Sequence, residues 1–275
     1  MSALPPSAGH ARAAYDGFAP FYDAFTAHHD YEAWTRDLEA LAREAGARGG
    51  GRLLDVACGT GKSFLPFLER GWDVTACDVS PAMAELAAAK ATPRATVAVH
   101  DMRVLPVLGS FDLILCLDDA LNYLLEPDEV AAALTRMRAN LAPGGVLLFD
   151  VNSVRTYREA FGTLDVMPAE DLVIVWRGEV GAGFEAGGRA SAVTHVLDRA
   201  DRGWRERRQR HHQRHHPVRT VREALRAAGL SVSAIRGMAP DGAVVAHFDE
   251  LRCTKAIYVA TTDQAQRPGT GTRGT

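Results

Sequence analysis

Short apolar runs alternate with segments of helical periodicity through the first half of the chain. Each run has four to seven residues, a length that fits a buried strand and is too short for a helix. Before the last run, residues 128–141 carry an amphipathic helical pattern. Regular alternation of strands and helices predicts a mostly parallel sheet. The five predicted strands are 53–56, 72–78, 96–100, 111–117 and 146–151.

The pattern changes after a short predicted helix at 153–161. Three alternating or apolar segments follow, separated by Gly-rich turns, and predict an antiparallel β insertion at 172–180, 190–198 and 203–214. A helix at 217–228 and two further strands at 230–237 and 255–261 are predicted to complete the fold. We expect disorder over about the first ten residues and again from residue 263.

Length, charge and cysteine usage narrow the class of protein. The chain has 275 residues, enough for one large domain or a domain with an insertion. Its net charge of −3 gives no general attraction to nucleic acid or anionic membranes. No apolar run is long enough to span a membrane and no secretory signal is seen, so we predict a cytoplasmic protein. The four cysteines lack zinc-ligand spacing, which predicts free thiols and no metal site.

A glycine turn between the first strand and the next helix carries the main chemical signal. Its sequence, at 52–62, is RLLDVACGTGK, and strand, glycine turn and helix form the nucleotide-binding unit of a doubly wound sheet. A phosphate-binding P-loop would need glycine where Val56 stands. A dinucleotide fold would need a third glycine where Phe64 stands.

The acidic Asp55 on the strand, followed by A-C-G-T-G, resembles motif I of class I S-adenosylmethionine (SAM) dependent methyltransferases. The L-x-P-G-G segment before the strand at 146–151 is similar to the same family. The resemblance implies a seven-stranded Rossmann-like sheet, mostly parallel with an antiparallel last strand, an N-terminal helical cap and an antiparallel β insertion. We therefore expect a helical lid at 1–45, a SAM-binding core at 46–162 and 217–262, an insertion over the active site at 163–216, and a disordered tail at 263–275.

Polar residues at strand ends are the candidates for holding SAM. Asp78 ends the second strand, where a carboxylate accepts both ribose hydroxyls of an adenosyl ligand; the alternative is a charge at a helix start. The resemblance places Asp101 against the adenine amino group and Tyr22, in an A-x-x-Y-D segment, in the lid. The predicted cofactor-binding residues are Tyr22, Asp55, Ala57, Gly59, Gly61, Asp78, Val79, Asp101, Met102 and Leu117.

Two features are expected on the acceptor side. The fourth strand runs into Asp118 and Asp119, and because capping and solvation also explain acidic pairs, we assign Asp118 to the site and Asp119 to the surface. The strand at 203–214 is rich in arginine and histidine but is a weak signal for nucleic acid or metal. It resembles the family's H-x-x-R-x-aromatic pattern, with His211, Arg214 and, in the aromatic place, His216.

We predict that Asp118 and His211 face one pocket and accept a proton where the reaction requires it. A register slip by one residue would instead exchange His211 with His212. The predicted substrate-binding residues are Tyr15, Asn122, Tyr123, Asp150, Asn152 and Arg214.

The resemblance implies methyl transfer by in-line displacement to a nitrogen, oxygen or carbon nucleophile of a small molecule. The overall layout is similar to that of bacterial natural-product enzymes, including deoxyaminosugar N-methyltransferases. Two alternatives stay open: a SAM-binding enzyme without methyl transfer, and a regulatory protein that binds SAM or a nucleoside. We expect a monomer or homodimer that binds neither nucleic acid nor membrane.

Overall fold

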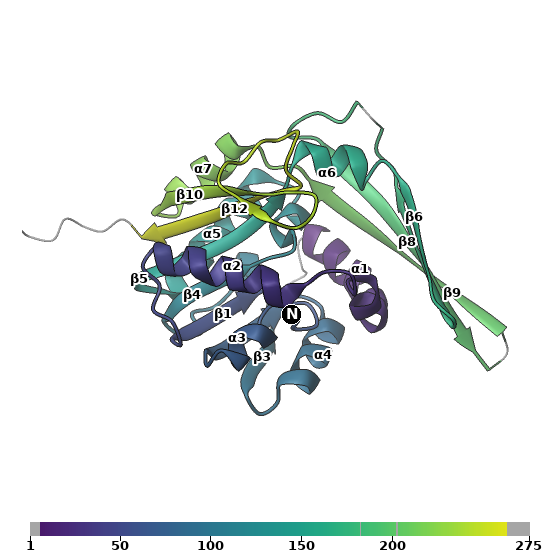
Figure 1. The fold of residues 1–275 in the computed structure, drawn as a ribbon, viewed down its shortest axis with the longest axis horizontal. Helices are drawn as coiled ribbons and strands as arrows, with labels where there is room; N and C mark the ends of the chain where they lie inside the picture. The colour runs from purple at the N-terminus through teal and green to yellow at the C-terminus, as the bar shows by residue number, and fades with distance from the viewer. Residues whose placement is uncertain (1–5, 182, 202, 263–275) are drawn as a thin grey trace, which may run out of the picture.

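A computed structural model describes residues 6–181, 183–201 and 203–262 (Figure 1). The core is an eight-stranded sheet, within which β1, β2, β3, β4 and β5 are mutually parallel where they pair. β12 runs antiparallel to both of its neighbours, β5 and β10. In spatial order the strands are β11 (Val244–Val245), β10 (Leu230–Met238), β12 (Lys255–Thr262), β5 (Leu141–Asn152), β4 (Phe111–Cys116), β1 (Arg52–Val56), β2 (Asp73–Asp78) and β3 (Ala95–Val99).

This sheet confirms the predicted fold class, with one strand more than expected. The additional strand, β11, has two residues, too few to leave a periodic signal in the sequence. The strand order reverses between β1 and β4, which lie side by side. In open α/β sheets, ligands bind outside the carboxyl ends of the strands at such a switch point.

Helices cover both faces of the sheet because successive strand residues point to opposite sides. Leu54 and Ile114 pack on the side of α5 and α7, whereas Leu53 and Leu113 pack on the side of α2, α3 and α4. The covering helices are α2 (Tyr31–Glu44), α3 (Leu65–Glu69), α4 (Pro81–Ala91), α5 (Pro127–Asn140) and α7 (Val218–Ala227). Three short helical segments complete the core: η1 (Met102–Val104), η2 (Ala120–Tyr123) and α6 (Val154–Glu159).

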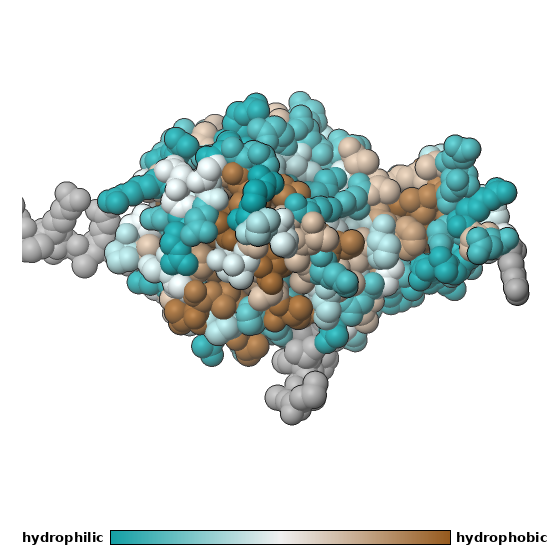
Figure 2. Space-filling view, turned by 90° about the horizontal axis from the view of Figure 1, so that it is seen from below, coloured by the Kyte–Doolittle hydropathy of each residue, from teal (hydrophilic) through white to brown (hydrophobic). Residues whose placement is uncertain are grey.

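A second, four-stranded antiparallel sheet extends to one side of the core (Figure 1). We call it the arm; its strands are β6 (Leu164–Pro168), β7 (Leu172–Gly178), β8 (Arg189–Ala200) and β9 (Gly203–Arg214). The sequence predicted three of these strands but missed β6, whose five residues end in proline. Figure 2 shows apolar side chains gathered over the core and again on the arm. Leu164 and Val166 of β6 are among the exposed apolar residues.

The N-terminal helix α1 (Pro6–Phe25) lies between the core and the arm and contacts β9 (Figure 1). The expectation of disorder up to about residue 10 is therefore wrong for residues 6–10. Phe18 of α1 packs against Ile174 and Val196 from the inner face of the arm. The predicted disorder at 263–275 falls outside the described residues, and the predicted domain limits stay a prediction. No helix in the described part of the chain is long and apolar enough to cross a membrane.

Candidate active site

The glycine turn after β1 opens onto a cavity at the carboxyl edge of the sheet. Ala57, Gly59 and Gly61 have positive φ angles of 62°, 55° and 90°. A Cβ atom at Gly59 would meet nothing closer than Tyr22 Cε1 at 3.7 Å, so Gly59 leaves open space below the Tyr22 ring. A Cβ atom at Gly61 would lie 2.9 Å from Phe64 Cζ. Gly61 is therefore required by packing within the turn, and it does not line the cavity for which we predicted it.

We call this space the first cavity. It brings together residues that are far apart in the sequence: those of α1, the turn after β1, the end of β2, η1 and the segment after β4. The predicted site residues that line it are Tyr15, Tyr22, Ala57, Gly59, Asp78, Val79, Met102, Leu117, Asp118 and Tyr123.

Asp78 lies at the end of β2, and both of its carboxylate oxygens accept hydrogen bonds. Oδ2 accepts the Gly59 backbone N–H at 2.9 Å, and Oδ1 accepts the Ser80 N–H at 2.8 Å. Each oxygen has a second acceptor site, so the side chain can also take two hydroxyl groups from a ligand. Burial raises the pKa of Asp78 to about 6. The two N–H groups therefore hold an otherwise unfavourable buried carboxylate in a fixed orientation at the cavity wall.

Asp55 provides an independent indication that a polar ligand belongs here. Its Oδ2 accepts the Ser63 hydroxyl at 2.5 Å, whereas Oδ1 is buried without a partner. Burial raises the pKa of Asp55 to about 7. Ser63 lines the first cavity, but Asp55 itself does not. A buried acceptor without a donor is costly, and the ammonium group of an amino-acid ligand would relieve that cost.

A smaller hollow adjoins the first cavity beyond Ala57 and Val79. Asp101 and Met102 line it, together with Tyr123. The Asp101 carboxylate accepts the Arg103 backbone N–H at 3.0 Å and lies 2.6 Å from Arg103 Nη2. Its pairing with arginine fixes Asp101 at the rim of this hollow, and the predicted contact with adenine stays a prediction. The hollow, Asp78 and the unpaired Asp55 oxygen fit the base, ribose and amino-acid ends of SAM.

Helix α1 closes the first cavity through hydrogen bonds to the core. Thr60 donates to Asp23 at 2.5 Å, and Ser80 donates to Asp16 at 2.6 Å. Lys62 donates to the backbone oxygen of Thr26 at 2.9 Å. The lysine of the near-P-loop sequence therefore holds the end of α1, which accounts for its presence without a phosphate ligand.

A second cavity, of about 390 Å³, lies between α1, the arm and the carboxyl ends of β4 and β5. Its walls are largely aromatic, with Phe18, Phe25, Phe161 and Trp176 among the lining residues. Five residues line both cavities and therefore mark the junction between them. These residues are Tyr15, Tyr22, Tyr31, Asp118 and Tyr123.

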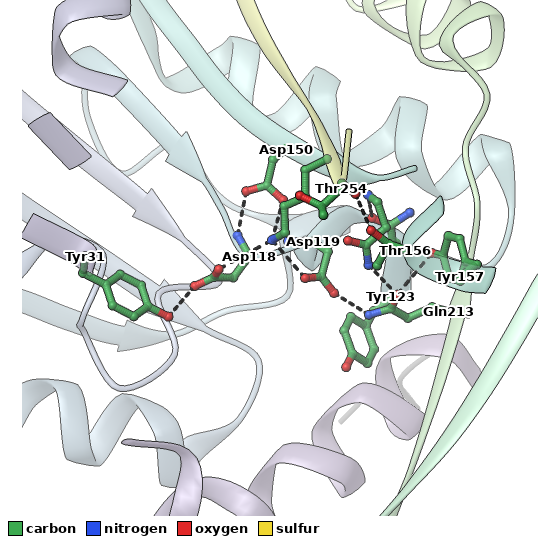
Figure 3. A network of polar contacts seen from close by, with 12 residues as sticks. Tyr31, Asp118, Asp119, Tyr123, Asp150, Thr156, Tyr157, Gln213 and Thr254 are labelled. Carbon is green, nitrogen blue, oxygen red and sulfur yellow. Dashed lines mark hydrogen bonds and ion pairs between the residues drawn. The ribbon is translucent and has the colours of Figure 1, made fainter. Parts of the chain in front are cut away.

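Asp118 lies at this junction and Asp119 beside it, with their side chains pointing apart (Figure 3). Asp118 accepts the Tyr31 hydroxyl at 2.7 Å, and Asp119 accepts an amide N–H from Gln213. Both residues have positive φ angles, of 54° and 51°. Their backbone N–H groups donate to the carboxylate of Asp150 at 2.9 and 2.7 Å, which holds this tight bend. Asp119 lines the second cavity, so its assignment to the surface is wrong.

Lys255, the first residue of β12, joins the three carboxylates. Its Nζ lies 3.1 Å from Asp119 Oδ1, 3.1 Å from Asp150 Oδ1 and 3.5 Å from Asp118 Oδ1. Burial opposes the charge of Lys255, but the three carboxylates outweigh it and raise its pKa. Burial raises the pKa of Asp119, and that of Asp150 to about 6. One ammonium among three carboxylates leaves an excess of negative charge at the junction.

His211 lines the second cavity together with Asp118. Tyr15 donates to the Tyr123 hydroxyl at 2.8 Å, and the Tyr123 hydroxyl lies 3.0 Å from His211 Nδ1. Burial lowers the pKa of His211 to about 4, so the ring is neutral near pH 7. His212 points to the other side of the strand, toward Ser191. The structure therefore brings Asp118 and His211 into one cavity, while their catalytic roles stay a prediction.

Three predicted substrate-binding residues lie outside both cavities: Asn122, Asp150 and Arg214. Arg214 donates to the Leu125 oxygen and pairs with Glu126, on the opposite face of β9 from His211. The predicted contact of Arg214 with the acceptor is therefore wrong, because residues three apart on a strand point to opposite sides.

Asn122 and Asp150 are fully buried and hold the backbone around the site. Asn122 accepts the Asn152 N–H at 2.9 Å and donates to the Arg214 oxygen at 2.8 Å. Asp150 supports the 118–119 bend from behind, so both are positioning residues. Asn152 does line the second cavity, as predicted for an acceptor-side residue.

Sequence reasoning missed Lys255, Gln213, Tyr31 and Trp176, which all line the second cavity. Gln213 could have been found, because it lies two residues from His211 and therefore on the same face of β9. Lys255 could also have been found, because the first residue of an antiparallel last strand lies beside the carboxyl ends of its neighbours. It pairs with Asn152 at the end of β5. Tyr31 and Trp176 left no comparable signal.

Comparison with known proteins agrees with this geometry. Residues 53–145 match the family described as "Methyltransferase domain". The chain is 31% identical to "Putative methyltransferase YqeM" of Bacillus subtilis strain 168, over 80% of this chain and 88% of that protein. The chain therefore belongs to the methyltransferase family, and its fold is that of the class I branch, which uses SAM.

Two further relatives are named as sugar N-methyltransferases. The first is the dTDP-4-amino-2,3,4,6-tetradeoxy-D-glucose N,N-dimethyltransferase of Saccharopolyspora spinosa, 34% identical over 36% of this chain and 39% of that protein. The second is the solved structure of the sugar N-methyltransferase KedS8 from Streptoalloteichus, 27% identical with a TM-score of 0.71. That alignment covers 88% of this chain and 92% of KedS8.

Proposed function

We propose that this methyltransferase transfers the methyl group to an amine nitrogen of a small molecule. The observation that carries the proposal is the Asp118–Asp119 pair at the junction of the two cavities. A carboxylate there attracts an amine as its ammonium form and can accept the proton that must leave before nitrogen can react. The relatives named for N-methylation support the same choice.

The first cavity would hold SAM, which supplies an electrophilic methyl group when bound. Asp78 would accept the ribose hydroxyls, and the Gly59 backbone would lie against the ligand because no side chain blocks it. Asp55, which lies behind the cavity-lining Ser63, would attract the ammonium end by its charge, and Asp101 with Met102 would hold the base. Tyr22 and helix α1 would exclude water from the junction.

On the acceptor side, the chain's own residues orient and deprotonate the amine. Tyr31 fixes the Asp118 carboxylate through its 2.7 Å hydrogen bond. Asp150 fixes the backbone that carries it, so the carboxylate cannot turn away. Aromatic rings form much of the surrounding wall. Holding two reactants in line accounts for much of the rate gain in such reactions.

An oxygen acceptor is less well served by this site. A phenol or alcohol needs a strong base, and His211, whose pKa burial lowers to about 4, is a weak one. The phenolate or alkoxide that formed would be repelled by the carboxylates of Asp118 and Asp119. The site therefore favours an amine, which enters as a cation and becomes a neutral nucleophile when it loses a proton.

The test is a turnover screen with methyl-labelled SAM and matched acceptor sets of amines, phenols and alcohols. We expect labelled product from amines, with the label on nitrogen by mass spectrometry. Labelled phenols or alcohols in preference to amines would contradict the proposal. Tight SAM binding with no labelled product from any set would favour the alternative of a binding protein without methyl transfer.

A further inference from the structure

We infer that the second cavity selects acceptors by charge: it takes an organic ammonium whose remainder is uncharged, and excludes acceptors that bear phosphate or a nucleotide. This deepens the proposed function, on which it rests, and assigns the discrimination to Asp119. It also sets this chain apart from the relative that is named for a dTDP-linked sugar.

The charges that face the cavity carry the inference. Among the described lining residues, Asp118, Asp119 and Asp165 are acidic, and Lys255 is the only lysine or arginine. The histidines that line the cavity are His28, His29 and His211, and burial lowers the pKa of His29. The Lys255 ammonium is already shared by Asp118, Asp119 and Asp150 within 3.5 Å. A phosphate would have to compete with these carboxylates for one ammonium while being repelled by them.

Asp119 is the carboxylate best placed to select acceptors by their charge, apart from the proton transfer assigned to Asp118. Asp118 lines both cavities and is held by Tyr31, whereas Asp119 lines the second cavity only. Figure 3 shows its carboxylate turned toward Gln213, whereas that of Asp118 is turned toward Tyr31. Gln213 donates to Asp119 Oδ2 and Lys255 to Oδ1, which fixes the direction of both oxygens.

The cavity walls suit the rest of an organic cation. The rings of Tyr15, Phe18 and Trp176 surround His211 with centroids 5.5, 5.9 and 5.4 Å away. Aromatic faces attract a cation and exclude an anion. The His211 ring is neutral near pH 7, since burial lowers its pKa to about 4, so it supplies no positive charge for a phosphate.

Arginines on the arm do not alter this conclusion. Arg207, on the same face of β9 as His211, pairs with Asp198 at 3.3 Å, and its guanidinium lies over the Phe21 ring. Arg205 pairs with the same Asp198 carboxylate. Neither arginine lines the second cavity.

The experiment compares four probes of one shape: benzylamine, benzyl alcohol, benzoate and benzyl phosphate. Their binding to the full protein is measured by calorimetry at pH 7, where benzylamine is a cation. We expect benzylamine to bind on the order of tenfold tighter than benzyl alcohol, and the two anions not to saturate. Benzyl phosphate or benzoate binding as tightly as benzylamine would overturn the inference.

The Asp119→Asn variant tests whether Asp119 causes the preference for an ammonium group. We expect the preference for benzylamine over benzyl alcohol to fall to about threefold or less, because one charge-assisted contact is lost. The control is Asp37→Asn on the exposed face of α2, which should keep the full preference. An unchanged preference in a folded Asp119→Asn protein would overturn the assignment to Asp119. The order of the four probe affinities in the wild-type protein tests the inference even if that variant does not fold.

A second experiment separates this inference from the proposed function. Amines and their phosphorylated counterparts, for example aminoethanol and phosphoethanolamine, are each assayed separately with labelled SAM. Methylation of the phosphorylated amines at equal kcat/KM would overturn the charge selection and leave N-methylation standing. Phenol methylation by a cavity that still prefers ammonium probes would overturn the proposed function and leave the selection standing.

Discussion

The ammonium of Lys255 lies 3.1 Å from the carboxylate of Asp150, which is fully buried at the end of β5. The two residues belong to antiparallel neighbours, β12 and β5, and meet because β12 starts where β5 ends. The pair is therefore a brace between the two strands, and Lys255 also lines the second cavity. Removing either partner would leave buried charge uncompensated.

Lys255→Met should destabilise the protein by about 3–5 kcal/mol, because three carboxylates would lose their shared ammonium. The measurement is the free energy of unfolding in urea at pH 7. Lys90→Met serves as the control, since Lys90 pairs with Asp23 at the surface and such pairs contribute less than about 1 kcal/mol. Equal losses in the two variants would show that Lys255 is not a structural brace.

Asp55 should make the stability of the ligand-free protein depend on pH. Burial raises its folded-state pKa to about 7, above the usual value for aspartate. The folded protein therefore holds this proton more tightly than the unfolded chain. The resulting stability is complete below about pH 4 and is lost as the pH rises toward 7.

In Asp55→Asn, the fall in unfolding free energy between pH 4 and 7 should shrink by roughly 2–4 kcal/mol. Asp78 and Asp150 also have raised pKa values and remain in the variant, so part of the pH dependence should persist. Urea unfolding across this range measures the difference, with Asp37→Asn as a control that should follow the wild type. Parallel curves for wild type and Asp55→Asn would refute the argument.

Two glycines with positive φ provide a matched test of the first cavity. Gly59 has a φ of 55° and faces the cavity, whereas Gly71 has a φ of 84° and has nothing within 4 Å of a Cβ position. Gly59→Ala and Gly71→Ala should both lose about 1–2 kcal/mol of stability from backbone strain. We expect more than tenfold weaker SAM binding for Gly59→Ala alone, measured by calorimetry at a temperature where both are folded. Similar SAM affinities in the two variants would exclude Gly59 from the site.

Asp78→Ala should weaken SAM binding by about 2 kcal/mol, through loss of charge-assisted hydrogen bonds to the ribose. The same loss should appear for the demethylated product, which retains the ribose. Asp37→Ala, an exposed change on α2, should leave both affinities intact. Unchanged affinities in Asp78→Ala would remove this residue from cofactor binding.

The sequence predicted the parts of the site that local signals encode. The turn at Gly59, the acidic end of β2 at Asp78 and the position of His211 follow from strand ends and motif spacing. Lys255 and Gln213 depend on how distant strands pair, which no local pattern records. The local pattern at Asp119 is equally typical of a capping or solvated carboxylate, and its place in the second cavity depends on the arm, which supplies Gln213. Arg214 was misplaced because a motif was followed across three residues of a strand, where the side chain must change faces.

Asp118 and His211 should differ in their effects on catalysis, although both line the second cavity. Asp118→Asn removes the carboxylate that would take the amine proton, so we expect kcat to fall by roughly 10²–10³-fold with nearly unchanged SAM affinity. His211→Ala removes a neutral ring that holds Tyr123, so we expect a smaller loss, about tenfold, seen mainly in the KM for the amine.

The control for this comparison is Tyr31→Phe, which keeps the Asp118 charge but removes the hydroxyl that orients it. The kcat of Tyr31→Phe should lie between those of the wild type and Asp118→Asn. Without the Tyr31 hydroxyl, the Asp118 carboxylate still accepts a proton but is misaligned for part of the time. The kcat of His211→Ala should keep the wild-type pH profile above pH 6, where His211 is already neutral. A pH limb that disappears in His211→Ala, together with full activity in Asp118→Asn, would make His211 the proton acceptor instead.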